Sequence, residues 1–480
     1  MTDTSVDADN TLSVGGILGY ATKTCTITQC TVSNAANSAM ITGAACVGGV
    51  IGEAAETVTL IGCEVVSKIS ALGGDYNKDF TSVGLAGGII GYAAAGGSMT
   101  NNGYSGTLSS SGTGANDAVG GIIGYTAKFC TITECTTSNA EISGSYRVAG
   151  IVGRVAGSDK TNRTLISGCK VKDNVSITAS GAYVGGIVGR NHAGAGPCVS
   201  SCIVNASLSC TNTDSDNYIG GVIGDTGGAV KVEKCCVTGN LTGKHKRIGG
   251  IIGSMPTNVK YDASDISECA YLGGQITGTT QLGGIVGVVT TAAKISNCYS
   301  ISGSIKGTGY TGGIVGNYTG TIVGDNTVLS LSDCHVSNCF STMDNNTEEG
   351  NSNGGLIGCF GPGNETNRKT SNSGSVTACI AWNGKVLASN TTNSGCVIGA
   401  AGWYSTLADC YRNPEMELGL TKISDSENVS STVPATASPY HGKAAGENET
   451  VSSIAENTLG WSGEIWDFSE DLPTLKNLPK

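Results

Sequence analysis

Cysteine offers this chain most of its potential chemistry, because 20 of its 480 residues are cysteine. Thiolates bind zinc in paired C-x-x-C or Cys/His clusters, whereas only four histidines are present and the cysteines recur at long, similar intervals. Disulfide frameworks serve short chains without a core, yet 39% of these residues are apolar and can form one. The pattern favours buried cysteines that act as small hydrophobic side chains, with disulfides and then a metal site as the alternatives.

Acidic side chains gather in three polar stretches, at 73–80, 211–218 and 344–353. A glycan-cleaving β-helix needs clustered carboxylates or a Lys/Arg base beside a groove, and stacked loops could assemble such a group. Asp214 and Asp216 could bind calcium, but the twelve-residue loop with its glycine and terminal glutamate is absent. Because charged residues make up only 14% of the chain, solvated turns are favoured. The sequence predicts no catalytic residue, no metal site and no cofactor.

Glycine-rich turns raise the question of nucleotide binding. The motif G-G-x-Φ-G, in which Φ is Ile, Leu or Val, recurs at spacings of 29 to 42 residues. Phosphate binding would need one G-x-G-x-x-G between a strand and a helix, whereas here the order differs, the motif repeats and no helical period follows it. The glycines are therefore predicted to be structural. The copies begin at Gly15, Gly48, Gly87, Gly120, Gly185, Gly220, Gly249, Gly283, Gly312 and Gly354, with looser copies at Ala149 and Gly395.

An apolar-x-x-Cys step follows the glycine motif in nearly every repeat. The third repeat keeps its apolar residue, Met99, but has Asn102 where the cysteine is expected. One more apolar residue between small ones follows in most repeats, so each repeat contains three short β-like segments. The cysteines of this step are predicted to stack as a structural ladder, which comprises Cys30, Cys63, Cys135, Cys169, Cys202, Cys235, Cys269, Cys298, Cys334, Cys379 and Cys410.

These repeats predict an all-β fold, a parallel β-solenoid (β-helix) of about twelve coils over residues 13–412. Equivalent residues of adjacent coils lie about 4.8 Å apart, so a glycine needed once, for positive φ or close backbone approach, is needed in every coil. Residues 1–12 are an N-terminal lead-in, and the polar residues 413–450 are predicted to be a linker or loop. Residues 451–480 are predicted to cap the exposed end of the solenoid, with an aromatic glycan-binding platform as the alternative.

The net charge of the chain and the residues near its first position indicate which partners and which location to expect. The formal net charge of −11 argues against nucleic-acid or anionic-membrane partners. No run of 18 apolar residues occurs, so membrane insertion is not expected. The residues after Met1 are acidic and polar and lack the features of a signal peptide. We expect a mature or trimmed piece of an exported protein, extracellular or at the cell surface, whose anchor this chain does not show.

Residues 282–316, LGGIVGVVTTAAKISNCYSISGSIKGTGYTGGIVG, resemble GLUG-motif repeats, and the resemblance extends over roughly 13–412. Such repeats occur in bacterial surface and secreted proteins, among them adhesin-like proteins and the non-catalytic parts of some immunoglobulin A peptidases. The resemblance implies a surface or secreted location, and it carries no catalytic residues over to positions of this chain.

The sequence therefore predicts a non-catalytic bacterial adhesion or binding protein that presents variable loops on a rigid solenoid. The loops at 73–80, 211–218 and 341–374 are expected to contact a host or neighbouring-cell protein or glycan. Two alternatives remain, a polysaccharide-cleaving β-helix enzyme and a structural spacer module of a larger exported protein.

Overall fold

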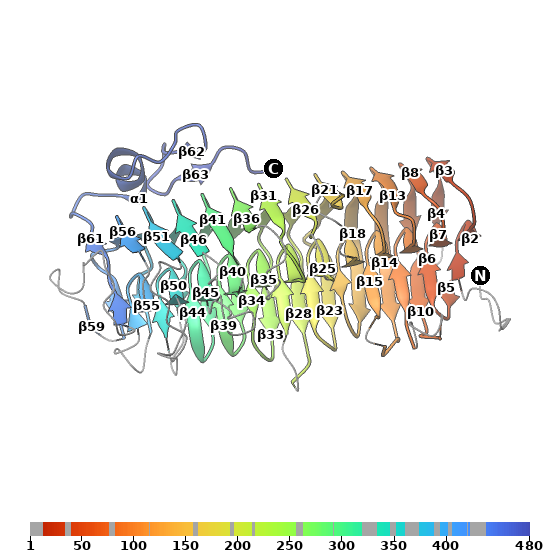
Figure 1. Ribbon diagram of the computed structural model, residues 1–480, viewed down its shortest axis with the longest axis horizontal. Helices are drawn as coiled ribbons and strands as arrows, with labels where there is room; N and C mark the ends of the chain where they lie inside the picture. Colours follow the sequence, from red (N-terminus) through yellow and green to blue (C-terminus); the bar gives the residue numbers. More distant parts are fainter. Residues whose placement is uncertain are drawn as a thin grey trace, which may run out of the picture. The chain divides into compact units, whose positions relative to one another are not determined.

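The computed structural model divides into two compact units, residues 1–228 and 229–480. Regular structure in both units is almost entirely β, and stacked parallel strands form a β-solenoid (Figure 1), which confirms the predicted fold class. The residues that the structure describes are 13–33, 40–75, 82–114, 116–156, 162–192, 196–213, 217–255, 263–290, 292–318, 334–345, 352–360, 374–387, 394–401, 406–419, 421–422 and 438–480.

Each coil contributes one strand to each of three sheets and up to two strands to a fourth. In the first unit, sheet 1 contains β1 (Ser13–Gly15), β6 (Cys46–Gly48), β11 (Leu85–Gly87), β15 (Ala118–Gly120), β19 (Val148–Ala149), β24 (Tyr183–Gly185) and β29 (Tyr218–Gly220). Sheet 2 contains β2 (Leu18–Ala21), β7 (Ile51–Ala54), β12 (Ile90–Ala93), β16 (Ile123–Thr126), β20 (Val152–Val155), β25 (Val188–Asn191) and β30 (Ile223–Thr226). Sheet 3 contains β3 (Cys25–Thr28), β8 (Val58–Ile61), β13 (Gly97–Thr100), β17 (Cys130–Thr133), β21 (Leu165–Ser167) and β26 (Cys198–Ser200). Sheet 4 contains β4 (Thr31–Ser33), β5 (Met40–Gly43), β9 (Glu64–Val66), β10 (Lys68–Ala71), β14 (Gly103–Ser110), β18 (Thr136–Gly144), β22 (Lys170–Val171), β23 (Val175–Ala179), β27 (Ile203–Val204) and β28 (Ser207–Cys210).

The second unit repeats this layout. Its sheet 1 contains β34 (Ile248–Gly249), β39 (Thr280–Gly283), β44 (Gly309–Gly312), β49 (Asn353–Gly354) and β54 (Ser394–Gly395). Sheet 2 contains β35 (Ile252–Met255), β40 (Val286–Val289), β45 (Val315–Tyr318), β50 (Ile357–Phe360), β55 (Ile398–Ala401) and β60 (Ser438–Tyr440). Sheet 3 contains β31 (Lys231–Glu233), β36 (Ser264–Ser267), β41 (Ala293–Ser296), β46 (Cys334–Ser337), β51 (Gly374–Thr377) and β56 (Thr406–Ala408). Sheet 4 contains β32 (Cys236–Val237), β33 (Leu241–Gly243), β37 (Ala270–Leu272), β38 (Gln275–Thr277), β42 (Tyr299–Ile301), β43 (Ser304–Lys306), β47 (Phe340–Ser341), β48 (Asp344–Asn345), β52 (Ile380–Ala381), β53 (Lys385–Val386), β57 (Tyr411–Arg412), β58 (Glu417–Leu418), β59 (Thr421–Lys422) and β61 (Lys443–Ala444).

The motif glycines are needed where sheets 1 and 2 approach each other. A Cβ atom on Gly120 would lie 2.0 Å from the carbonyl oxygen of Ile123, and one on Gly153 would lie 2.6 Å from the amide nitrogen of Val119. Neither glycine has a positive φ. The close approach of two backbones, and not a left-handed turn, is therefore the reason that these positions are glycine.

A left-handed residue turns the chain from sheet 3 into sheet 4. In each described coil it directly precedes the ladder cysteine, or Asn102 in the third repeat, and its φ lies between 51° and 65°. Only two of these residues are glycine, so the others bear the steric cost of the left-handed conformation. They are Gln29, Gly62, Asn101, Glu134, Gly168, Ser201, Lys234, Glu268, Asn297, Asn338, Ala378 and Asp409.

Residues 451–480 pack against sheet 4 of the second unit, and a cap over the open end of the solenoid is not shown. They form α1 (Val451–Ser453), η3 (Ile454–Thr458) and an antiparallel pair, β62 (Trp466–Asp467) and β63 (Thr474–Leu475), beside strands of the second unit (Figure 1). The Trp466 ring lies 5.8 Å from the Tyr299 ring and 6.0 Å from the Phe340 ring, centroid to centroid. Apolar side chains on sheet 4, rather than the open end, are what this segment covers.

The alternative prediction, an aromatic glycan-binding platform, finds no support at Trp461 and Trp466, and Trp403 lies outside the described residues. Trp461 and Trp466 are 4% and 0% exposed, so neither ring face is available to a sugar. Part of the predicted linker adds strands instead: β60 pairs antiparallel with β55, and β61 pairs parallel with β57. Residues 438–444 thereby pair with strands of the last coil. This pairing leaves fewer backbone N–H and C=O groups of the last coil without a hydrogen-bond partner.

Candidate functional site

The ladder cysteines bind backbone carbonyl groups of the preceding coil. Most of these thiols donate to the carbonyl oxygen of the equivalent apolar residue in the preceding coil, as in Cys63 to Ile27 at 3.7 Å and Cys410 to Val376 at 3.6 Å. Cys30 is half-buried, and the other ladder cysteines that the structure describes are buried. A cysteine here fills a small apolar space and satisfies part of a buried carbonyl group, since its S–H is a weak donor.

Asn102 replaces a ladder cysteine with a stronger version of the same contact. Its Nδ2 donates to the carbonyl oxygen of Leu60 at 3.0 Å, and its Oδ1 accepts from the backbone N–H of Cys63 at 2.9 Å. The side chain is 1% exposed. The position therefore selects for a small group that can donate to the preceding coil, which both cysteine and asparagine provide.

Cys334 does not hold the ladder position, so this part of the prediction is wrong. The pairing of β46 with β41 places Cys334 opposite Ala293 and Val336 opposite Ile295. Cys339 follows Val336 by three residues, and its Sγ lies 3.8 Å from the carbonyl oxygen of Ile295. The sequence misled because this repeat contains the apolar-x-x-Cys spacing twice, five residues apart.

Burial raises the pKa of several ladder thiols, whereas hydrogen bonds from the Cys135 and Cys202 thiols lower the pKa of Cys169. Burial raises the pKa of the Cys410 thiol to about 12 and raises the pKa of the Cys298 and Cys339 thiols well above the ordinary range. A protonated thiol is a poor nucleophile and a poor metal ligand. No disulfide joins the cysteines that the structure describes. The raised pKa values of Cys298, Cys339 and Cys410 agree with the predicted structural role of these ladder cysteines.

The three loops predicted to contact a partner are described only in part. In the first loop, the Asp75 Oδ1 atom accepts from the backbone N–H of Ser82 at 2.8 Å. Asp214 and Asp216, the suggested calcium ligands, lie outside the described residues. Also outside them are 76–80, 346–351 and 361–373.

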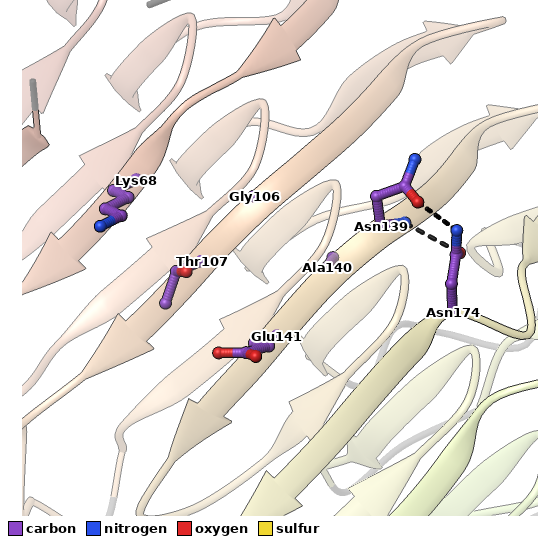
Figure 2. A pocket seen from close by; sticks show the side chains of 7 residues that line it. All are labelled: Lys68, Gly106, Thr107, Asn139, Ala140, Glu141 and Asn174. Carbon is purple, nitrogen blue, oxygen red and sulfur yellow. Dashed lines mark hydrogen bonds between the residues drawn. The ribbon is translucent and has the colours of Figure 1, made fainter. Parts of the chain in front are cut away.

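An open polar pocket lies on sheet 4 of the first unit. Its volume is about 290 Å³. It is lined by Lys68, Gly106, Thr107, Asn139, Ala140, Glu141 and Asn174. Figure 2 shows that the side chains come from neighbouring strands of the sheet.

Strand register places three of these side chains in one row. Lys68 in β10, Thr107 in β14 and Glu141 in β18 each precede a buried apolar residue, and those apolar residues are paired across the three strands. Because alternate residues of a strand face opposite sides, the three polar side chains share the exposed face of sheet 4. Figure 2 shows them side by side.

A β-bulge and a pair of amides form the other wall of the pocket. The register between β14 and β18 shifts at Tyr104 and Gly106, and Asn139 has a φ of 48°. The backbone N–H of Asn139 donates to the Asn174 Oδ1 atom at 2.9 Å, and the Asn174 Nδ2 group donates to Asn139 Oδ1 (Figure 2). The bulge bends the strand locally, and the reciprocal amide contact fixes both side chains at the rim.

The pocket contains the groups of a binding site. It offers one ammonium group, one carboxylate, one hydroxyl and two amides. Glycoside hydrolysis requires two carboxylates, of which this pocket supplies one. Within the described parts of the chain, no group of three or more His, Cys, Asp or Glu residues could hold a metal ion. The available chemistry is therefore hydrogen bonding to a polar ligand.

Sequence reasoning missed this pocket because it looked for clustered carboxylates and long loops. The signal that could have found it is the apolar residue that follows the cysteine in most repeats. Aligning Ile69, Leu108 and Ile142 would have placed the residues before them in one row. The amide pair is harder to foresee, since it depends on a register shift that the repeat pattern does not contain.

Of the helices among the described residues, none has the length and apolar character needed to cross a bilayer.

Comparison with known proteins gives limited matches. No family model matches the chain. Halomucin from Haloquadratum walsbyi is 31% identical over 165 residues, which make up 32% of this chain and 2% of halomucin. Among solved structures, a candidate immunoglobulin A1 protease from Bacteroides ovatus is 16% identical with a TM-score of 0.43, over 67% of this chain and 94% of that one. The chain thus spans a very small part of the length of halomucin.

Proposed function

We propose that this protein is a non-catalytic binding protein and that the polar pocket on sheet 4 recognises the hydroxyl groups of a glycan. The observation that supports this is the row of Lys68, Thr107 and Glu141 beside the Asn139 and Asn174 amides. Donors and acceptors of this kind, spaced about 4.8 Å apart from strand to strand, suit the adjacent hydroxyl groups of a sugar. The bulge and the strands hold the groups in place before the ligand arrives.

The proposed location is the cell surface or the extracellular medium, and the proposed partner is a glycan of a host or neighbouring cell. The resemblance of residues 282–316 to GLUG-motif repeats supports this location. The repeat architecture supports it too, because a solenoid presents long sheet faces on which a site of a few side chains can be placed. The enzyme and spacer alternatives make different predictions in the same experiment.

A glycan array followed by calorimetry on the best ligand tests the proposal. We expect Glu141→Gln and Lys68→Gln each to weaken glycan binding about tenfold, as loss of a charged hydrogen bond usually does. The matched controls are Glu56→Gln and Lys128→Gln, which change exposed residues of the same unit outside the pocket. The controls should bind as the unchanged protein does.

Three results separate the alternatives. Binding that Glu141→Gln and Lys68→Gln leave unchanged would contradict the pocket. Release of reducing ends or unsaturated sugars from a polysaccharide, abolished by one carboxylate substitution, would establish the enzyme. If the protein neither binds a glycan nor degrades a polysaccharide, the spacer alternative is favoured.

A further inference from the structure

Three of the seven arginines of the chain lie together in the first unit. Arg154 in β20 is in register with Arg190 in β25, and Arg147 directly precedes β19. Tyr125 in β16 and Asp225 in β30 continue the row on either side. Four of these side chains therefore follow one another across sheet 2 at the strand spacing of about 4.8 Å.

Tyrosine rings support the guanidinium groups. The Cζ atom of Arg154 lies 4.5 Å from the centroid of the Tyr125 ring, and that of Arg190 lies 4.3 Å from the Tyr183 ring. The Cζ atom of Arg147 lies 5.6 Å from the same Tyr183 ring. Stacking on a ring uses the flat face of a guanidinium and leaves its N–H edges to bind groups in the plane.

Arg154 retains an unused donor in a buried position. Its Nη1 donates to the Asn116 Oδ1 atom at 2.7 Å. The residue is only 6% exposed, and its Nε has no hydrogen-bond acceptor among the residues that the structure describes. A buried N–H group of a charged side chain is costly to leave unmatched, so this position calls for an acceptor.

Among the residues that the structure describes, positive charge exceeds negative charge around the three arginines. Asp225 pairs with Arg190, whose Nε lies 3.0 Å from its Oδ2 atom. Asp117 is the acidic group near Arg147, but its carboxylate already accepts from the Ser110 hydroxyl and from three backbone N–H groups. The three guanidinium groups thus have two carboxylates nearby. The carboxylate of Asp117 already accepts hydrogen bonds from other groups.

Burial is the main cause of the lowered pKa values of Arg147 and His192, and the neighbouring arginines add to it. Burial lowers the pKa of Arg147 to about 9, with the charges of Arg154 and Arg190 acting in the same direction. Burial and these arginines also lower the pKa of His192, so its imidazole is neutral at pH 7. Glu53 lies three strands from Arg154 on sheet 2, and its carboxylate accepts a hydrogen bond from the Ser13 hydroxyl. Its negative charge is therefore too far away to balance the positive charge of the arginines.

The charged row is not a requirement of the repeat. The equivalent positions on sheet 2 of the second unit are Ser254, Val288, Asn317, Cys359 and Ala400. A side chain that the coil needed for packing would recur from coil to coil, as the glycines do. The arginines occur in only a few coils of the first unit. This restriction favours a role in binding a ligand over a role in packing the coils.

We propose that the arginine cluster, defined as Arg147, Arg154 and Arg190, binds an oxyanion, the carboxylate or sulfate group of an acidic sugar. Arginine N–H groups form a fork that matches either oxyanion with two parallel hydrogen bonds. The ligand enters beside Arg190, whose side chain is 25% exposed, where the rings of Tyr183 and Tyr218 stack at 4.7 Å. The cluster shares no residue with the polar pocket, so this inference does not rest on the proposed function.

Calorimetric titration of the full chain at low ionic strength tests the cluster. The probes are inorganic sulfate, sodium glucuronate and glucose 6-sulfate, with glucose as the neutral control. We expect the anions to bind and glucose not to bind at this site. Binding of inorganic sulfate as tightly as glucose 6-sulfate would show that the oxyanion alone is recognised, and tighter binding of the sugar acids would show that the ring contributes.

Arg154 is the residue to change, because removing Arg190 would leave Asp225 buried without its partner. We expect Arg154→Gln to weaken anion binding at least tenfold, and Arg154→Lys to weaken it as well, since lysine keeps the charge but lacks the fork. The control is Arg247→Gln in the second unit, because Arg247, like Arg147, has a positive φ directly before a sheet 1 strand. Glu141→Gln in the polar pocket should also leave anion binding unchanged.

Circular dichroism of each variant shows whether its strands are retained. If Arg154→Gln fails to fold, the comparison of Arg154→Lys with the unchanged protein decides. The proposal is overturned if no anion binds at millimolar concentration, or if the folded Arg154 variants bind anions as tightly as the unchanged protein.

Discussion

Ala378 is the residue at which the left-handed corner fits its side chain least well. Its φ is 52°, and alanine, unlike asparagine or aspartate, has no polar group that could offset the cost locally. The same corner in other coils is occupied by residues as different as Gln29, Lys234 and Gly168. Side-chain identity is therefore weakly constrained here, and the backbone conformation is set by the turn into sheet 4.

Ala378→Gly should stabilise the second unit by about 1 kcal/mol, because glycine adopts a positive φ without steric cost. Urea unfolding followed by tryptophan fluorescence measures the change, since Trp461 and Trp466 lie in this unit. Ala381→Gly is the matched control, because Ala381 is buried in β52 and has no positive φ. This substitution should destabilise the second unit by about 1 kcal/mol. Equal destabilisation by both substitutions would contradict the argument.

Asp117 should make stability fall as pH rises through the weakly acidic range. Burial raises its pKa to about 6, whereas an unfolded aspartate has a pKa of about 3.9. The folded state therefore binds the proton more tightly, so the contribution is present below about pH 4 and is lost as the pH passes 6.

Asp117→Asn removes this dependence. The free energy of unfolding of the unchanged protein, relative to that of the variant, should fall by roughly 1.4 kcal/mol per pH unit between pH 4 and 6. Urea unfolding at several pH values measures the difference. A relative stability that rises over this interval would show that the hydrogen bonds to the carboxylate outweigh its burial.

At the scale of elements, the segment of residues 451–480 covers an apolar row that successive coils supply. Tyr299, Phe340, Ile380 and Tyr411 are paired strand to strand on sheet 4, and each directly follows a ladder cysteine position. On the equivalent strands of the first unit this position holds mainly polar or charged residues, as at Thr31, Glu64 and Lys170. A change from polar to apolar at one repeat position is thus the sequence signal of the covered face.

Trp466→Ala should destabilise the second unit by about 3–5 kcal/mol, because it removes a fully buried ring. The lost contacts with Tyr299 and Phe340 should raise hydrogen exchange in β42 and β47 before exchange rises in sheet 3. Phe129→Ala is the control, since that ring is 40% exposed and should cost little. Unchanged exchange in β42 and β47 would mean that the segment does not protect this face.

The repeat pattern predicted the β-solenoid because it reports backbone requirements that recur in every coil. Close backbone approach demands glycine each time, and the inward apolar residues are in register from strand to strand. The error at Cys334 shows where such reasoning fails: a spacing that occurs twice in one repeat is resolved only by strand pairing. The amide pair of the polar pocket was missed for a related reason, because it depends on a register shift at Gly106 and spacing carries no sign of a shift.

At the scale of the whole molecule, the cysteines are the feature most open to measurement. Cys25, Cys30, Cys198 and Cys359 are the partly exposed ones among the cysteines that the structure describes, and the rest of these are buried. Thiol titration of the native protein should therefore label few cysteines. After denaturation without reductant, all 20 should react. Few reactive thiols after denaturation would establish disulfides and contradict the ladder.

The covered apolar row also sets the order in which the molecule is completed. The strands that carry Tyr299, Phe340 and Tyr411 leave the ribosome before residues 451–480 do, so until then their aromatic side chains face water. An exposed apolar row of this kind favours association between chains. Truncated products that end before residue 451 should therefore aggregate more readily than the longer chain. The apolar row is protected from such association only after residues 451–480 have left the ribosome.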